Sequence, residues 1–448
     1  MRLSLSWSGE PAVPFAAFGR KQTGGVEKLK SDSYMRYILS FILLLAVQAV
    51  CGVQPYRTEI FNPNVHTLQV RLSGDPLAPP VALLGSENGI VVSFDMLEDN
   101  PQYLYYRVVH CDADWTPSLL SEVEYIDGFN GLSVDDYALS SNTYCNYVHY
   151  RIDLPNDDMR FRVSGNYALL VYPENNPDSL LLTACFSLTE NLVALSCEIT
   201  TRTDVDYNKA HQQLSFKVMY PQYEIRNPRE EIKAVVSANA DNESGVWLSQ
   251  PLYVRNQEAE YGHVPQLIFT AGNEYRRFET VSRHYNTIGV ESMRYFDPYY
   301  HALLRPDSPR AGGAYLYDET QKGRFFIRTD ESDEADTEAD YFVVHFTLAT
   351  GAPLDGEVYL DGEFTHGRRD ESTRLTYNPA TRAYEKSLLL KQGAYNYRYV
   401  LQRPGRAADA APIEGNFYET RNEYQIRIYH CPQGARYDRL VGYTRCRM

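Results

Sequence analysis

Residues 103–109 read YLYYRVV, and this stretch decides the fold. It is a short apolar run rich in aromatic and β-branched side chains, which favour strands. Turn residues bound it, as they bound strands. The stretch therefore predicts a β-strand.

Comparable short runs recur along the chain between turn residues, and they are typical of strands. Residues 114–125 are expected to contain a turn or a short helix, and no stretch of ten or more residues shows helical periodicity. The predicted class is mainly β, with tandem β-sandwiches. The clearest further runs are Thr67–Leu72, Ile90–Phe94, Tyr167–Tyr172, Leu214–Val218, Ile232–Val236, Tyr341–Phe346, Val358–Leu360 and Tyr395–Val400.

Composition and turn residues divide the chain into several units. Residues 56–190 are expected to form a first sandwich, residues 195–305 a second β domain and residues 341–430 a third. Residues 306–340 are expected to be a linker that ends in the acidic run Asp330–Asp340, read as a solvated loop or, alternatively, a calcium site. Residues 431–448 are expected to be a tail.

An apolar run at Tyr37–Val50 follows Met35 and Arg36. It is shorter than the roughly 20 residues that a membrane-spanning helix needs, and small residues follow it. Residues 35–52 are therefore predicted to be a cleavable signal peptide, and residues 1–34 a mis-annotated start or a disordered segment. A membrane anchor is the alternative; a lipoprotein cysteine at Cys51 fits less well, because Val50 stands where a small residue is needed.

The overall composition narrows the possible partners. A formal net charge of −15 argues against nucleic acid, which attracts clustered Lys and Arg. No later run is long enough to span a membrane. The cysteines after Cys51 are even in number, so disulfides could form if the chain is exported. None of them forms a CxxC pair, so a metal-binding or redox motif is not indicated. The plausible short loops are Cys185–Cys197 and Cys431–Cys446.

His110–Trp115 (HCDADW) is the one dense cluster of reactive residue types. Cys111 with a histidine could act as a nucleophile and base, and the two aspartates could bind a metal. However, neighbouring residues of a strand face opposite sides. The alternative places Cys111 in the core and Asp114 in a turn.

Motifs for phosphate, zinc or serine chemistry are lacking. We therefore expect no catalytic residue, cofactor, metal or small-molecule ligand, and no enzyme activity.

Gly272–Phe278 (GNEYRRF) places two arginines between aromatic residues in an acidic chain. Arginine and tyrosine are enriched at interface hot spots. The expected partner-binding residues are Asn273, Tyr275, Arg276, Arg277, Phe278, Tyr299 and Tyr300. The alternative is an ordinary strand after a hairpin.

Two tyrosine-rich stretches, Tyr295–Tyr300 and Tyr395–Tyr399, allow several interpretations. Alternate residues of the second would form a ladder on one face of a strand. Such a ladder could shield the sandwich core, contact a protein or stack on sugar rings.

A set of sequence blocks in a fixed order resembles the type IX secretion system plug proteins of Bacteroidota, over roughly residues 60–430. The blocks are Asp112–Trp115 with Pro117–Ser118, Asn142–Thr143, His149–Tyr150, Ser164–Tyr172, Ala271–Phe278, Leu316–Glu319, Gly323–Phe326 and Lys391–Tyr397.

The resemblance implies a periplasmic protein that closes the periplasmic mouth of the outer-membrane translocon barrel, SprA, and prevents leakage through the idle pore. The third unit also resembles early-set immunoglobulin-like domains. The competing hypothesis is an exported carbohydrate-binding or glycan-processing β-sandwich protein.

Overall fold

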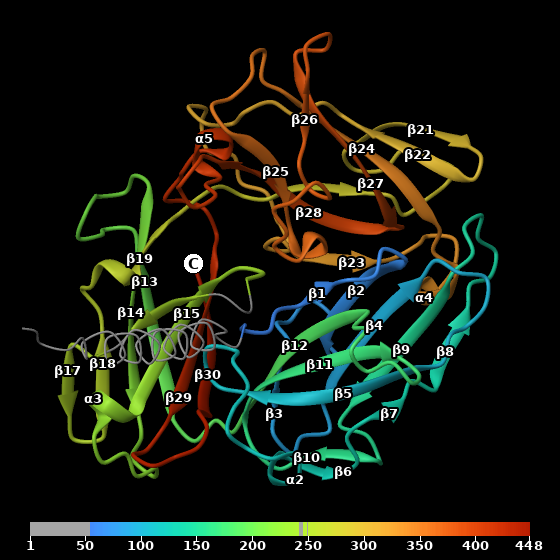
Figure 1. The fold of residues 1–448 in the computed structure, drawn as a ribbon. Helices are drawn as coiled ribbons and strands as arrows, with labels where there is room; N and C mark the ends of the chain where they lie inside the picture. The colour runs from blue at the N-terminus through green and yellow to red at the C-terminus, as the bar shows by residue number, and fades with distance from the viewer. Residues whose placement is uncertain (1–53, 242–244, 249) are drawn as a thin grey trace, which may run out of the picture. The chain divides into compact units, whose positions relative to one another are not determined.

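Strands dominate the computed structural model, which describes residues 54–241, 245–248 and 250–448 (Figure 1). The mainly β class predicted from the sequence is confirmed. The predicted signal peptide at residues 35–52, the segment 1–34 and Cys51 lie outside the described residues. Within the described ranges, no helix is long and apolar enough to cross a membrane. The described strands pair into three β-sandwiches, each with its own hydrophobic core.

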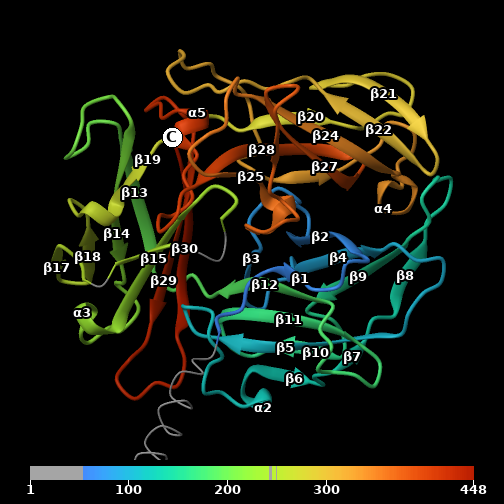
Figure 2. The ribbon, with the colours of Figure 1, turned by 45° about the horizontal axis from the view of Figure 1, so that its top comes forward.

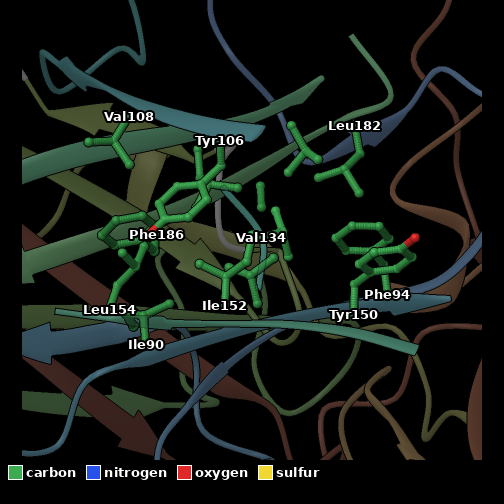
Figure 3. Packing of buried hydrophobic residues seen from close by; sticks show 14 of the residues in the cluster. Ile90, Phe94, Tyr106, Val108, Val134, Tyr150, Ile152, Leu154, Leu182 and Phe186 are labelled. Carbon is green, nitrogen blue, oxygen red and sulfur yellow. The ribbon is translucent and has the colours of Figure 1, made fainter. Parts of the chain in front are cut away.

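YLYYRVV forms most of a strand of the first sandwich, and its residues Leu104, Tyr106 and Val108 belong to the buried core. Figure 3 shows Tyr106 and Val108 in this core together with the stacked rings of Phe94 and Tyr150. One sheet has the order β1-β12-β11-β5-β7 with β3 beside β12, the other has β2-β4-β9-β8, and β6 pairs with β10. The elements are β1 (Glu59–Ile60), β2 (Val65–Leu72), β3 (Val81–Leu83), β4 (Ile90–Met96), β5 (Leu104–Cys111), α2 (Glu122–Tyr125), β6 (Ile126–Gly128), β7 (Leu132–Ser133), β8 (Asp136–Leu139), β9 (Val148–Leu154), β10 (Met159–Phe161), β11 (Gly165–Pro173) and β12 (Leu182–Thr189).

The second sandwich is completed by the C-terminal end of the chain. Its sheets have the orders β13-β14-β18-β17, with β19 beside β14, and β16-β15-β29-β30. Figure 2 shows β29 and β30 beside β15. The elements are β13 (Ala194–Thr200), β14 (His211–Met219), α3 (Pro228–Glu231), β15 (Ile232–Ala238), β16 (Val246–Leu248), β17 (Tyr253–Arg255), β18 (Glu258–Tyr261), η1 (Pro265–Leu267), β19 (Ile268–Thr270), β29 (Glu423–His430) and β30 (Arg439–Arg447).

The third sandwich is built from the chain between β19 and β29. Its sheets have the orders β20-β28-β23, with β25 beside β28, and β21-β22-β24-β27-β26. The elements are β20 (Arg276–Glu279), β21 (Val290–Phe296), β22 (Tyr299–Leu304), β23 (Phe325–Ile327), α4 (Ala335–Glu338), β24 (Tyr341–Ala349), β25 (Glu357–Asp361), η2 (Glu363–Thr365), β26 (Thr376–Asn378), β27 (Ala383–Lys391), β28 (Gly393–Gln402) and α5 (Ala411–Glu414).

Several local expectations change with the structure. The segment 431–448, expected as a tail, contains β30, because its apolar residues fill the second core. β20, β21 and β22, which precede residue 305, pair within the third sandwich. Domain boundaries and the immunoglobulin-like type stay predictions.

The cysteine pairing also differs from the expected short loops. Cys197 on β13 and Cys446 on β30 form a disulfide with a Cα–Cα distance of 6.5 Å. Cys185 is buried in the first sandwich and Cys431 is half-buried, and neither takes part in this disulfide. The two sheets of the second sandwich bring the paired cysteines together from positions 249 residues apart.

The acidic run Asp330–Asp340 is a docking segment rather than a solvated loop. Asp340 is fully buried and accepts hydrogen bonds from the backbone N–H groups of Tyr144 (2.9 Å) and Cys145 (3.2 Å). Glu338 accepts hydrogen bonds from Ser141 and Asn142. These carboxylates hold the loop after β8 of the first sandwich against α4 of the third.

Candidate functional site

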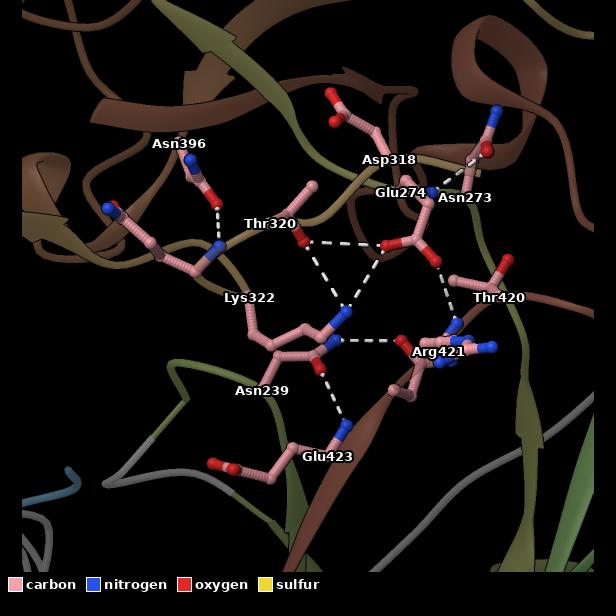
Figure 4. A network of polar contacts seen from close by, with 12 residues as sticks. Asn239, Asn273, Glu274, Asp318, Thr320, Lys322, Asn396, Thr420, Arg421 and Glu423 are labelled. Carbon is pink, nitrogen blue, oxygen red and sulfur yellow. Dashed lines mark hydrogen bonds and ion pairs between the residues drawn. The ribbon is translucent and has the colours of Figure 1, made fainter. Parts of the chain in front are cut away.

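GNEYRRF lies where the second sandwich, the third sandwich and residues 318–322 meet (Figure 4). The range 306–340, expected as a linker, contains β23 and α4. Gly272 turns the chain with a φ of +64°, a value that favours glycine. Glu274 is buried, and its carboxylate accepts hydrogen bonds from the Tyr315 hydroxyl (2.9 Å), the Lys322 ammonium (3.2 Å) and the backbone N–H of Arg421 (2.8 Å). One buried carboxylate therefore ties three segments that are distant in sequence.

The two arginines of GNEYRRF form ion pairs within the chain. Arg276 pairs with Asp307 (2.6 Å) and Glu414 (3.0 Å), and its side chain is only 9% exposed. Burial alone would lower the pKa of Arg276, but the two carboxylates raise it above the usual arginine value. Arg277 pairs with Asp318 at 3.0 Å and remains 38% exposed.

The remaining GNEYRRF side chains predicted to bind a partner also pack inward. Phe278 is fully buried and stacks on Tyr395 at a centroid distance of 5.1 Å. Tyr275 is 7% exposed, and Asn273 donates to the Glu414 carbonyl at 2.8 Å. As a partner-binding set these residues stay a prediction, but Arg277 is the member whose charged group reaches the surface.

Tyr299 and Tyr300 belong to an aromatic surface that spans two sandwiches. We call Tyr144, Tyr295, Phe296, Tyr299 and Tyr300 the tyrosine patch. The Tyr144 ring, from the first sandwich, lies 4.8 Å from Tyr295 and 5.3 Å from Tyr300, on the β21–β22 hairpin. Tyr144, Tyr295 and Phe296 are 52%, 41% and 56% exposed. The patch joins exposed aromatic surface from the first and third sandwiches, which the buried ion pair between Asp95 and Lys391 also connects.

The sequence indicated only some residues of the tyrosine patch. Tyr295 and Phe296 lie in a tyrosine-rich stretch, but Tyr144 carries no local signal, because its contact with β21 depends on the docking of Asp340. The second stretch forms the predicted core ladder: Tyr395, Tyr397 and Tyr399 are buried in the third sandwich. The hydroxyls of Tyr397 and Tyr399 donate to Asp307 at 2.7 and 2.8 Å, which gives this buried pair an internal partner.

The HCDADW cluster does not assemble a nucleophile and base. Cys111 is fully buried, its thiol donates to the Val109 carbonyl, and burial raises its pKa. His110 contacts the Ser118 hydroxyl (2.8 Å) and the Ser164 carbonyl (3.2 Å), and burial lowers its pKa to about 4. The interpretation with Cys111 in the core and Asp114 in a turn is confirmed.

Part of this cluster joins the first and second sandwiches. The backbone N–H of Ala113 donates to Asp438 at 3.0 Å, and Asp438 also pairs with Lys233 at 2.7 Å. In the described part of the chain, no group of three or more His, Cys, Asp or Glu side chains is placed to hold a metal ion.

Fold and site together define a tandem β-sandwich protein whose candidate site is an exposed aromatic surface. Residues 65–190 match the family model for the first domain of the type 9 secretion system plug protein. The crystal structure of a hypothetical protein from Parabacteroides merdae is 44% identical, covers 88% of this chain and 100% of its own, and superposes with a TM-score of 0.86. The chain belongs to the family of type 9 secretion system plug proteins.

Two other comparisons show no shared fold or family for this chain. A Pseudomonas fluorescens alkylpurine DNA glycosylase bound to DNA is 15% identical over 28% of this chain and 30% of its own, with a TM-score of 0.17, which is too low for a shared fold. Among proteins with curated descriptions, none matches this chain.

Proposed function

We propose that this protein is a non-catalytic periplasmic subunit that plugs the periplasmic opening of a SprA-type translocon barrel and prevents leakage through the idle pore. In this proposal a cleavable signal peptide exports the chain, and the mature protein associates with the inner face of the outer membrane through protein contacts. The observation that carries the proposal is membership of the plug protein family.

The internal contacts support a plug that keeps its shape. Lys391 of the third sandwich and Asp95 of the first form a fully buried ion pair at 2.7 Å, and Tyr341 donates to the same carboxylate at 2.7 Å. Arg324 and Glu423 form another buried pair at 2.7 Å between the third and second sandwiches. A protein that must seal an opening acts through complementary surface, and stable interfaces bury roughly 1,200–2,000 Å² in total.

The tyrosine patch is the surface that we propose for contact with the barrel. Tyrosine and arginine dominate interface hot spots, because rigid amphipathic rings bury large areas at low entropic cost. Arg283, which pairs with Glu331 and Asp340, lies over the Tyr144 ring at 5.8 Å and supports this ring from within the chain. Of the residues predicted from the sequence, Arg277, Tyr299 and Tyr300 remain the proposed contacts.

Co-purification tests the partner. Tagged wild-type protein is expected to recover the barrel from detergent-solubilised outer membrane. A variant with Tyr144→Ser, Tyr295→Ser and Phe296→Ser is expected to recover on the order of tenfold less, since hot-spot truncations each cost about 1 kcal/mol or more. The control carries Tyr207→Ser and Tyr253→Ser, which are 60% and 54% exposed on the second sandwich. Absence of the barrel from the wild-type eluate would contradict the partner.

Permeability tests the sealing role. A strain without this protein is expected to export type IX substrates normally but to admit large antibiotics through the empty pore. Complementation with the wild-type gene should restore resistance. Unchanged antibiotic sensitivity in the deletion strain would contradict sealing even if the barrel co-purifies.

A further inference from the structure

A polar cavity of about 500 Å³ lies at the junction of the three sandwiches. Its lining includes Gln69 and Arg71 of β2, Tyr275 before β20, His366 after η2 and Asn422 before β29. Ligand pockets in proteins typically measure about 300–1,000 Å³. The cavity therefore has the size of a small-molecule site, although the sequence led us to expect no such ligand.

Two buried polar side chains of this lining lack hydrogen-bond partners. Gln69 is 5% exposed and Tyr275 is 7% exposed, and no side-chain hydrogen bond joins either of them to another described residue. Gly323 lies against the Tyr275 ring, where an added Cβ would come within 2.8 Å of it. Most buried polar groups in proteins are hydrogen-bonded, and the cavity is where water or a ligand can reach these two side chains.

Arg71, Gln69 and Tyr275 all offer hydrogen-bond donors to the cavity. Arg71 lies two residues after Gln69, on the same face of β2, and its guanidinium donates to the Ser93 hydroxyl at 3.1 Å. Among the described residues, no carboxylate lies within ion-pair distance of Arg71. Burial lowers the pKa of Arg71, as expected for a cation whose lost hydration is not replaced by a close counter-ion.

The carboxylates of the lining are already engaged. Asp361 accepts hydrogen bonds from Arg369 and from Arg398, both at 2.6 Å. Asp409 accepts one from the backbone N–H of Ala411 at 2.9 Å. Asp241 and Glu363 also line the cavity, and each has an interaction within the chain, for Glu363 a hydrogen bond from the backbone N–H of Phe325 at 3.3 Å. The carboxylates of the lining therefore have partners, whereas the side chains of Gln69 and Tyr275 make no hydrogen bond with a described residue.

We propose that the cavity binds a small polar molecule that presents an oxyanion, carboxylate or phosphate, to Arg71, Gln69 and Tyr275. The guanidinium supplies the charge, and the amide and the phenol donate to the ligand oxygens. The site is separate from the tyrosine patch, and this inference does not depend on the proposed barrel partner.

Calorimetric titration of the purified protein with citrate, inorganic phosphate and glucose 6-phosphate tests the proposal, with glucose as the neutral control. At least one oxyanion is expected to bind with 1:1 stoichiometry and to raise the thermal midpoint, while glucose does neither. The citrate arm separates carboxylate from phosphate as the preferred group. If no oxyanion binds more tightly than glucose, the proposal is wrong.

Variants place the binding in this cavity. Arg71→Met is expected to weaken binding on the order of tenfold or more, because a hydrogen-bonded charge is lost. Tyr275→Phe removes a hydroxyl without a protein partner, so the ligand-free midpoint should not change while affinity falls several-fold. Arg226→Met, on an 83% exposed side chain, is the control. Wild-type affinity in Tyr275→Phe and Gln69→Met would overturn the assignment, even if Arg71→Met failed to fold.

Discussion

The Lys391 ammonium and the Asp95 carboxylate are 1% and 0% exposed where the third sandwich packs on the first. The same carboxylate accepts hydrogen bonds from His149 and Tyr341, both at 2.7 Å, and the ammonium lies 4.1 Å from the centre of the Tyr147 ring. Buried charges are tolerated only when they are paired and hydrogen-bonded. This site meets both conditions through residues from two sandwiches.

Lys391→Met should be strongly destabilising, because it leaves a buried carboxylate without its cation. We expect a loss of about 3–5 kcal/mol in the free energy of unfolding. The double variant Asp95→Asn with Lys391→Met should recover part of that loss, since no charge is left unpaired. Urea denaturation measures both. The exposed pair Arg374–Glu357 is the control, and Arg374→Met should cost less than about 1 kcal/mol.

The same carboxylate predicts how stability depends on pH. Burial alone would raise the pKa of Asp95, but Lys391 and His149 hold it below its usual value. A carboxyl with a depressed pKa stabilises the fold above its unfolded pKa of about 3.9 and loses that contribution as the pH falls through the folded value. Urea midpoints should therefore drop below about pH 4 and drop less in Asp95→Asn. Identical acid profiles would contradict this assignment.

At the scale of elements, local pattern predicted the strands but not their partners. YLYYRVV, Ile90–Phe94 and Tyr395–Val400 became β5, β4 and β28, because alternation and branching act within a few residues. Nothing local indicates that β15 pairs with β29. Closing a loop costs only about 0.6 kcal/mol more for each doubling of the number of residues in it. A strand that is distant in sequence can therefore pair almost as readily as a neighbouring one.

For the candidate site too, the sequence indicated the segment but not the residues that it contacts. GNEYRRF was singled out by residue type, but its arginine partners Asp307, Glu414 and Asp318 lie 31 to 138 residues away along the chain. The exposure of each arginine side chain depends on where its partners lie: Arg277 remains partly exposed, whereas Arg276 is buried. Residue type alone therefore could not tell which of the two arginines reaches the surface.

The disulfide between β13 and β30 should stabilise the second sandwich. Cys197 and Cys446 close a loop of 249 residues, and removing a cross-link of this kind typically costs about 2–5 kcal/mol. Cys446→Ser should lower the thermal midpoint, and a reductant should lower the wild-type midpoint equally. Cys431→Ser alters a free thiol and serves as the control. A midpoint insensitive to reductant would count against the cross-link.

At the scale of the whole molecule, the third sandwich is inserted into the second. The chain leaves the second sandwich after β19, builds β20 to β28, and returns with β29 and β30. The first sandwich differs, because all of its strand pairs form within residues 59–189. Residues 55–448 nevertheless form one compact unit.

This insertion predicts which truncations fold. A chain that ends at residue 422 lacks β29 and β30, and with them the core residues Tyr424, Ile426, Ile428 and Val441. Amide protons of β14 and β15 should then exchange rapidly, while those of β4, β5 and β11 stay protected. The matched variant excises residues 272–421 and joins β19 to β29 through a short Gly/Ser linker. It should restore protection in β14 and β15 without the third sandwich. If the truncated chain protected β14 and β15 as fully as the intact protein does, the two C-terminal strands would not be required for the second sandwich.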